Sequence, residues 1–172
     1  MNPLEQIACD LVDRAKGAGA TSADVVAREA DEFSTTLRLG KIESLKEAAS
    51  KALGLRVLLG IRSASSFSSD FSDSALGRLV ERTIAMAKVT SEDPASGLPE
   101  PSQLGYYAGD LALFSSDVEA LSTEERILLA RRAEEAALGA DPRIQNSEGA
   151  WFEASQGTMV YANSLGFARS YR

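Results

Sequence analysis

The sequence contains no histidine, and this absence limits the chemistry that the chain can perform. Without an imidazole, neither a Ser-His nor a Cys-His catalytic pair can form within the chain. The commonest protein ligand of zinc is missing as well. A carboxylate-only metal site or a Ser-Lys pair is compatible with the composition, but no residues are spaced to favour either. We therefore expect this chain to hold no catalytic, cofactor-binding or metal-binding residue.

Cysteine is nearly absent. A disulfide framework needs pairs, so the single Cys9 gives no sign of an oxidising compartment. Cys9 lies beside the apolar stripe of an expected helix, and no cation is placed to lower the pKa of its thiol. We interpret it as a small packing residue and not as a nucleophile.

Long apolar runs and basic clusters are also missing. No apolar run approaches the roughly 20 residues that a membrane span needs. The N-terminus has an acid at Glu5 and lacks the apolar region of a signal peptide. We therefore predict a cytoplasmic protein that makes no membrane contact. The net charge is −7 and the densest basic point is Arg131-Arg132, so direct binding of nucleic acid is not expected.

The sequence does contain three amphipathic helices, indicated by apolar residues at helical spacing. They are expected at residues 4–16, 74–88 and 123–138. Asn2 caps the first helix, Ser72 or Asp73 the second, and a capping box of Ser122 and Glu125 the third.

Strands are predicted where apolar and polar residues alternate. The first block is expected to contain strands at 24–30, 33–39 and 53–59, with a hairpin turn at Gly40-Lys41. Residues 42–53 have helix-forming composition. We interpret them as a strand, a short turn near 48–50 and the start of another strand, partly because of the resemblance described below. The second block is expected to contain a strand at 158–163, a turn at 163–166 and a final strand from 167.

These elements predict an α+β fold with helices packed on antiparallel sheets, in which a helix-plus-meander unit is duplicated. Two lobes are expected at about 1–90 and 111–172, joined by a connector at 91–110 that is rich in proline and glycine. The final strand has no partner in the remaining sequence. We therefore expect that the natural protein extends beyond Arg172 and that a C-terminal domain is absent here.

Several short motifs follow one another along the chain. They are LRLGKIE at 37–43, LGLRV at 53–57, the serine-rich stretch at 63–74, EDPASGLP at 92–99, DPRI at 141–144 and ANSLGF at 162–167. In this order they resemble the N-terminal part of the TldD/PmbA family, also called modulators of DNA gyrase. The DPASGLP connector favours the PmbA (TldE) branch. The resemblance spans nearly the whole chain and rests on the order of the motifs.

The resemblance implies a bacterial cytoplasmic assembly in which a TldD-like subunit pairs with a PmbA-like subunit to form a metal-dependent peptidase. The zinc motif of the family, His-Glu-x-x-x-His, belongs to the TldD-like subunit and lies beyond the N-terminal domain. Zinc is therefore expected in that partner and not in this chain. We expect this chain to form subunit contacts, either with a TldD-like subunit or by self-association, and to line a chamber for peptide substrates. Exposed strand edges could bind such a peptide by adding a strand.

Two other interpretations remain open. In the first, the chain is a free-standing interaction module linked to modulation of DNA gyrase. In the second, it is a small hydrolase that uses Lys46 or Lys51 with a serine of residues 63–74. No G-x-S-x-G motif surrounds these serines. The stretch is therefore better interpreted as the end of a strand and a loop that leads into a helix cap.

Overall fold

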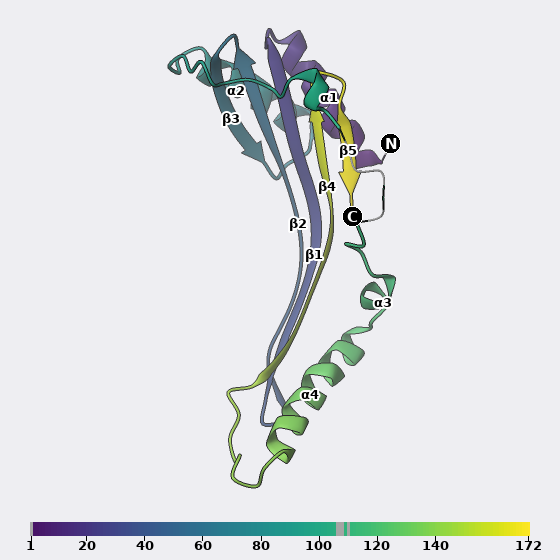
Figure 1. The fold of residues 1–172 in the computed structure, drawn as a ribbon. Helices are drawn as coiled ribbons and strands as arrows, with labels where there is room; N and C mark the ends of the chain where they lie inside the picture. The colour runs from purple at the N-terminus through teal and green to yellow at the C-terminus, as the bar shows by residue number, and fades with distance from the viewer. Residues whose placement is uncertain (1, 106–108, 110) are drawn as a thin grey trace. The chain divides into compact units, whose positions relative to one another are not determined.

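The computed structural model describes residues 2–105, 109 and 111–172. Its helices are α1 (Pro3–Gly17), α2 (Asp73–Ala87), the 3-10 turn η1 (Pro101–Gln103), α3 (Ser116–Glu119) and α4 (Thr123–Gly139). Its strands are β1 (Ser22–Arg38), β2 (Lys41–Leu59), β3 (Arg62–Ser68), β4 (Ala150–Asn163) and β5 (Ala168–Tyr171). In this part of the chain the strands form one antiparallel sheet in the order β3-β2-β1-β4-β5 (Figure 1). The predicted α+β class is confirmed.

The chain divides into two compact units. Unit 1 consists of Met1–Glu29, Ser50–Asp110 and Thr158–Arg172, and unit 2 of Ala30–Ala49 and Leu111–Gly157. We expected lobes that are continuous in sequence, at about 1–90 and 111–172. The observed units are interleaved, because the long strands β1, β2 and β4 contribute residues to both. The end of the expected connector, at 106–108 and 110, lies outside the described residues.

The strands are longer than the sequence pattern indicates. Residues 24–30 and 33–39, expected as two strands, belong to the single strand β1. Strand β2 continues through 48–50, where we expected a turn. This segment has no glycine, proline or asparagine to stabilise a turn. Pairing with neighbouring strands also overrides the helical propensity of residues 42–53.

The final strand has a partner, contrary to our expectation. β5 pairs antiparallel with β4, and the register runs from Met159↔Tyr171 to Ala162↔Ala168. The expected turn at 163–166 brings the chain back for this pairing. The expectation considered only the residues after the final strand as possible partners, whereas the partner, β4, precedes β5 in the sequence.

The helix caps are those that the sequence predicts. The Asn2 side chain accepts a hydrogen bond from the Glu5 amide at 2.7 Å, and Ser72 caps α2. At α4, Ser122 and Glu125 form a reciprocal capping box, in which the Ser122 amide donates to the Glu125 carboxylate at 2.7 Å. These caps satisfy amides at the helix starts that have no partner within the helix.

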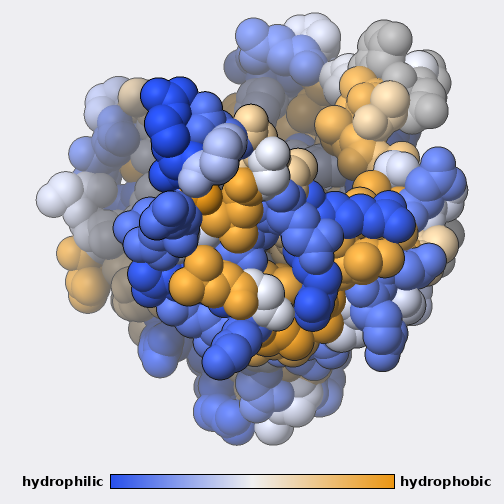
Figure 2. All heavy atoms as spheres, turned by 90° about the horizontal axis from the view of Figure 1, so that it is seen from below, coloured by the Kyte–Doolittle hydropathy of each residue, from blue (hydrophilic) through white to orange (hydrophobic). Residues whose placement is uncertain are grey.

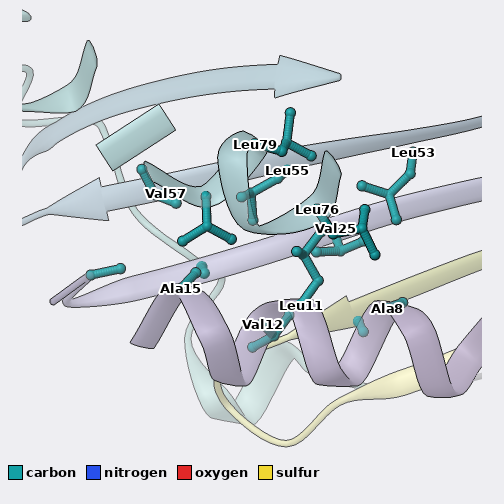
Figure 3. Packing of buried hydrophobic residues seen from close by; sticks show 14 of the residues in the cluster. Ala8, Leu11, Val12, Ala15, Val25, Leu53, Leu55, Val57, Leu76 and Leu79 are labelled. Atoms are coloured by element: carbon teal, nitrogen blue, oxygen red, sulfur yellow. The ribbon is translucent and has the colours of Figure 1, made fainter. Parts of the chain in front are cut away.

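The core of unit 1 lies between α1, α2 and one face of the sheet (Figures 1 and 3). Its larger buried side chains are Leu4, Leu11 and Val12 of α1, Leu76, Leu79, Val80 and Ile84 of α2, and Val25, Leu53, Leu55, Val57 and Val160 of the strands. Burying one such aliphatic side chain contributes roughly 1.5–3 kcal/mol. This apolar layer therefore supplies most of the stabilisation of unit 1.

Unit 2 packs α4 against β1. The Phe33 ring meets the Phe152 ring of β4 edge-on, with centroids 6.2 Å apart. The Arg126 guanidinium of α4 lies 4.9 Å from the centroid of Phe33. Apolar side chains also remain exposed in this unit, namely Leu39, Ile42, Leu45, Leu128, Leu129, Ile144 and Trp151. Seen from below, the molecule shows apolar groups interspersed among hydrophilic ones (Figure 2).

The turn between β1 and β2 has an unusual conformation that α4 stabilises. Leu39 and Gly40 both have positive φ, at 49° and 74°. Leucine is unfavourable in this left-handed region, which suits glycine or asparagine. The buried Glu134 carboxylate accepts the amides of Leu39 and Gly40, each at 2.8 Å. Glu134 therefore compensates for the leucine by satisfying both amides of the turn.

Replacing Glu134 should destabilise unit 2 in a pH-dependent way. The Gly40 amide, followed by that of Leu39, lowers the pKa of Glu134 in the folded state. The stabilisation is therefore complete above the unfolded-state pKa of about 4.3 and is lost as pH falls through the folded-state pKa. We expect Glu134→Gln to lower the free energy of unfolding at neutral pH and to flatten its decline below about pH 4.3 in urea titrations. Glu135→Gln removes the same charge from an exposed position, and an equal effect of both variants would contradict this role.

Gly149 approaches β1 so closely that a side chain does not fit. Its φ is +107°, and an added Cβ would lie 2.8 Å from the Leu37 carbonyl oxygen. We expect Gly149→Ala to reduce the free energy of unfolding by at least about 1 kcal/mol. Gly77→Ala is the matched control, because Gly77 is helical and has open space around it. That substitution should stabilise the protein by roughly 0.5–1 kcal/mol, and urea unfolding should therefore give opposite signs for the two variants.

Candidate functional site

Cys9 packs against the hydrophobic core of unit 1 and is partly buried. Burial raises the pKa of its thiol, and the negative charges of Glu5, Asp13 and Asp10 raise it further. A nucleophilic cysteine needs a lowered pKa. The surroundings therefore agree with the interpretation of Cys9 as a packing residue.

The serines of the 63–74 stretch make local contacts. The Ser68 hydroxyl donates to the Asp70 main-chain carbonyl at 2.9 Å and accepts the Asp70 amide at 3.0 Å. The Ser66 hydroxyl lies 3.6 Å from the Met86 sulfur. The Lys51 ammonium lies 4.9 Å from the centroid of the Phe71 ring. These contacts give the Ser-Lys hydrolase interpretation no geometric support.

The residues that the structure describes do not fit a zinc site. Within residues 2–105, 109 and 111–172, no group of three or more cysteine, aspartate or glutamate side chains is placed to hold a metal ion. The sequence also has no histidine. Carboxylates alone favour harder cations, whereas protein zinc sites draw mainly on nitrogen and sulfur ligands. In the same described part of the chain, no helix combines the length and apolar character required to cross a membrane.

The charged cluster with the best-defined geometry lies on the face of the unit 1 sheet opposite α1 and α2. It joins three neighbouring strands, with Asp24 on β1, Arg56 on β2 and Tyr161 on β4. Arg56 Nε lies 3.1 Å from each carboxylate oxygen of Asp24, and Arg56 Nη2 also binds Asp24 Oδ2. The Tyr161 hydroxyl donates to Asp24 Oδ2 at 3.4 Å. The Asp24 carboxylate thus holds two side chains from the strands on either side of it.

The cluster presents its positive charge outward. The Arg56 side chain is 38% exposed, whereas that of Asp24 is 10% exposed. Hydrogen bonding to Asp24 raises the pKa of Arg56 further. Burial, followed by the Asp24 charge among smaller contributions, raises the pKa of the Tyr161 phenol. At neutral pH the surface here is therefore a guanidinium beside a neutral phenol, which is suited to recognition and offers no nucleophile.

Aromatic contacts extend this cluster toward β5. The Tyr161 ring lies 5.9 Å from that of Phe167, and the Arg169 guanidinium lies 5.5 Å from the Phe167 centroid. The Asn163 side-chain oxygen accepts the amides of Leu165 at 3.0 Å and Phe167 at 3.2 Å, which holds the preceding turn in place. The ANSLGF motif therefore shapes the turn that positions Phe167 beside Tyr161.

Sequence inspection did not select Asp24, Arg56 or Tyr161 as site residues. The sequence around Arg56 could have indicated it, because Arg56 lies between the inward-facing residues Leu55 and Val57 and so must face outward from the strand. Nothing in the sequence, however, indicates that β1 lies between β2 and β4. The cluster therefore depends on a strand order that local patterns do not determine.

Solved structures share this fold. A crystal structure from Bacteroides thetaiotaomicron, described as a candidate modulator of DNA gyrase, matches 99% of this chain with a TM-score of 0.87 and 24% identity. The crystal structure of TldE from Thermococcus kodakarensis matches 96% of the chain with a TM-score of 0.82 and 15% identity. The chain covers 39% and 36% of these two proteins. The fold is therefore that of the TldE and gyrase-modulator structures.

Sequence comparison identifies the family. The model of PmbA/TldA metallopeptidase domain 1 matches residues 23–87, and that of the PmbA/TldA metallopeptidase central domain matches 116–172. The chain is 38% identical to the Metalloprotease PmbA homolog of Haemophilus influenzae and 35% identical to the Metalloprotease PmbA of Escherichia coli O157:H7, over 98% of its own length in each case. It spans 37% of the length of each relative. The chain belongs to the PmbA/TldD metallopeptidase family, on its PmbA-like branch.

Removing the Asp24 charge should change the titration of Tyr161. Because Asp24 is one of the groups that raise the pKa of Tyr161, Asp24→Asn is expected to lower that pKa, and the released Arg56 charge acts in the same direction. The phenol can be followed by NMR with tyrosine labelled at the ring carbon that bears the hydroxyl. Asp31→Asn, on the same strand but exposed, is the control. An unchanged Tyr161 titration in Asp24→Asn would contradict the described coupling.

Proposed function

We propose that this chain is the N-terminal domain of a PmbA/TldE-like subunit in a cytoplasmic TldD/TldE-type metal-dependent peptidase that processes or degrades peptides. The identity to PmbA proteins, 38% and 35%, is the observation that supports this most directly. The subunit is proposed to be non-catalytic. A TldD-like partner then supplies the zinc, since the sequence has no histidine and the described residues do not fit a zinc site.

The proposed work of this chain is binding and positioning. A non-catalytic subunit contributes to a peptidase by shaping the chamber and by holding the catalytic subunit in its active arrangement. The chain has the features that such work needs: a five-stranded sheet, a charged side chain, Arg56, held by a hydrogen-bonded ion pair, and exposed apolar residues. Modulation of DNA gyrase is the described role of structural relatives below 25% identity, which share the fold alone.

The proposal is tested by reconstitution. The native protein that carries this chain is purified alone, and also together with a TldD-like subunit, from the source cells. We expect the protein alone to bind no stoichiometric zinc and to leave an unfolded fluorogenic peptide intact. The mixture should contain zinc and hydrolyse the peptide, and a chelator should abolish this activity. Zinc-dependent hydrolysis by the protein alone would overturn the non-catalytic assignment, and failure of the two proteins to associate would overturn the complex.

A further inference from the structure

The segment that follows α2 is held against the rest of unit 1 by polar contacts. We call residues 88–96 of this segment the strap, and they include the first part of the DPASGLP motif. In Figure 1 the strap belongs to the teal coil that leaves the end of α2. The two stretches that match family models end at residue 87 and begin at residue 116. The strap is therefore the start of the connector between the two matched domains.

Arg62, the first residue of β3, makes most of the contacts with the strap. Its Nη1 donates to the Lys88 carbonyl at 3.3 Å and to the Thr90 carbonyl at 3.2 Å. Its Nη2 lies 3.3 Å from the Glu92 carboxylate. The two carbonyls follow the end of α2, where carbonyls lack partners within the helix and a positive charge is favourable. A single side chain thus joins three positions of the strap to β3.

The strap passes around the β2–β3 turn from one face of the sheet to the other. Side chains alternate between the two faces along a strand. Ala64 of β3 belongs to the core, so Arg62 lies on the face that packs on α1 and α2, and Ser63 lies on the opposite face. The hydroxyl of Ser96, at the end of the strap, lies 3.4 Å from the Ser63 hydroxyl. The contacts of the strap therefore begin on the helix side and end on the opposite face.

The DPAS part of the motif forms a turn through local hydrogen bonds. The Asp93 carbonyl accepts the Ser96 amide at 2.9 Å, and the Asp93 carboxylate accepts the Ala95 amide at 2.9 Å. Aspartate at the first position and proline at the second are typical of a β-turn. A main-chain bond then docks this turn, because the Asp93 amide donates to the Ile61 carbonyl of the β2–β3 turn at 2.9 Å. The motif thus forms its own turn and leaves the Asp93 amide available for docking.

The strap takes no part in the hydrophobic core of unit 1. None of residues 88–96 belongs to the buried cluster, and all of them are exposed or half-buried. Regions that are held by exposed polar contacts open locally at a lower free energy than a buried core does. Opening of the strap therefore requires the loss of a few polar contacts, chiefly those of Arg62, and leaves the apolar packing of α1 and α2 intact.

We propose that residues 88–96 are a releasable strap and that Arg62 is the residue that keeps it closed. The closed strap fixes the path of the connector at the β2–β3 turn. The open strap lets the start of the connector leave this turn while unit 1 stays folded. Because the Arg62–Glu92 ion pair is exposed, closure weakens as the salt concentration rises. This device does not depend on the proposed function.

The test is hydrogen exchange of the native protein that carries this chain, read at single amides by mass spectrometry. The Asp93 amide reports docking, because its hydrogen bond crosses to the β2–β3 turn. We expect Arg62→Gln to accelerate exchange at this amide roughly tenfold. The Thr21 amide, hydrogen-bonded to a β2 carbonyl at 2.8 Å, should not change. Arg82→Gln removes an exposed charge of α2 and, as the matched control, should leave both amides unchanged.

Two further variants test which contacts of Arg62 matter. Arg62→Lys keeps the positive charge but loses the planar guanidinium with its several donors, and we expect it to accelerate Asp93 exchange by an intermediate factor. Glu92→Gln leaves the two carbonyl contacts in place and should accelerate exchange less than Arg62→Gln does. In wild type, exchange at Asp93 should rise with salt, and Glu92→Gln should reduce this dependence.

Two results would overturn the proposal. Unchanged exchange at Asp93 in Arg62→Gln would show that other contacts keep the strap closed. Equal acceleration at Asp93 and Thr21 would show that the strap opens only when unit 1 unfolds as a whole, so that it is not releasable. Neither result bears on the peptidase complex, whose test measures zinc content and peptide hydrolysis.

Discussion

Alternation of side chains along a strand is the constraint from which the main features of unit 1 follow. On β1, Val25 points into the core while Asp24 and Val26 lie on the other face. The hydrophobic layer with α1 and α2 therefore fixes which residues are left outside. A slip of one residue would exchange the two sets, so the stability of the core and the arrangement of the side chains on the other face are coupled. The cluster of Asp24, Arg56 and Tyr161 is therefore positioned by a core to which its own side chains do not belong.

Two carboxylates act as local organisers in this protein, in different ways. Asp24 joins three strands within unit 1 by holding Arg56 and Tyr161. Glu134 reaches from α4 to the amides of a turn in unit 2. A buried carboxylate is unfavourable unless its oxygens are satisfied, and both groups meet this requirement with several donors. In each case the charge supports a specific geometry that apolar packing alone would not define.

The sequence alone predicted the helices correctly, but it did not predict the extent of the strands or the pairing of the last one. Helix ends were predictable because capping is local: Asn2, Ser72 and the Ser122–Glu125 pair act within a few residues. The strands were divided wrongly at 30–33 and 48–50, because their extended conformation depends on partners far away in sequence. The partner of β5 was missed for the same reason.

The cluster of Asp24, Arg56 and Tyr161 was hidden from sequence analysis by the same dependence. Asp24 and Tyr161 are 137 positions apart in the chain, and only the strand order brings them into contact. Arg56 could have been selected as an outward charge in a buried strand, but its role requires Asp24 as a neighbour. The family resemblance was reliable because it depends on the order of local motifs, and it carried no information about this face.

The contact between α1 and β5 has a consequence for how the protein is made. The Asn2 side chain donates to the Ser170 hydroxyl at 3.2 Å, across 168 positions of sequence, and α1 packs on β5. Synthesis proceeds from the N-terminus, so α1 leaves the ribosome long before its last neighbour exists. Closing such distant contacts is slow because the chain entropy of a long loop opposes it. The part of α1 that packs on β5 therefore stays uncovered until the last strand has been made, although α2 and the first three strands can cover the rest of α1 much earlier.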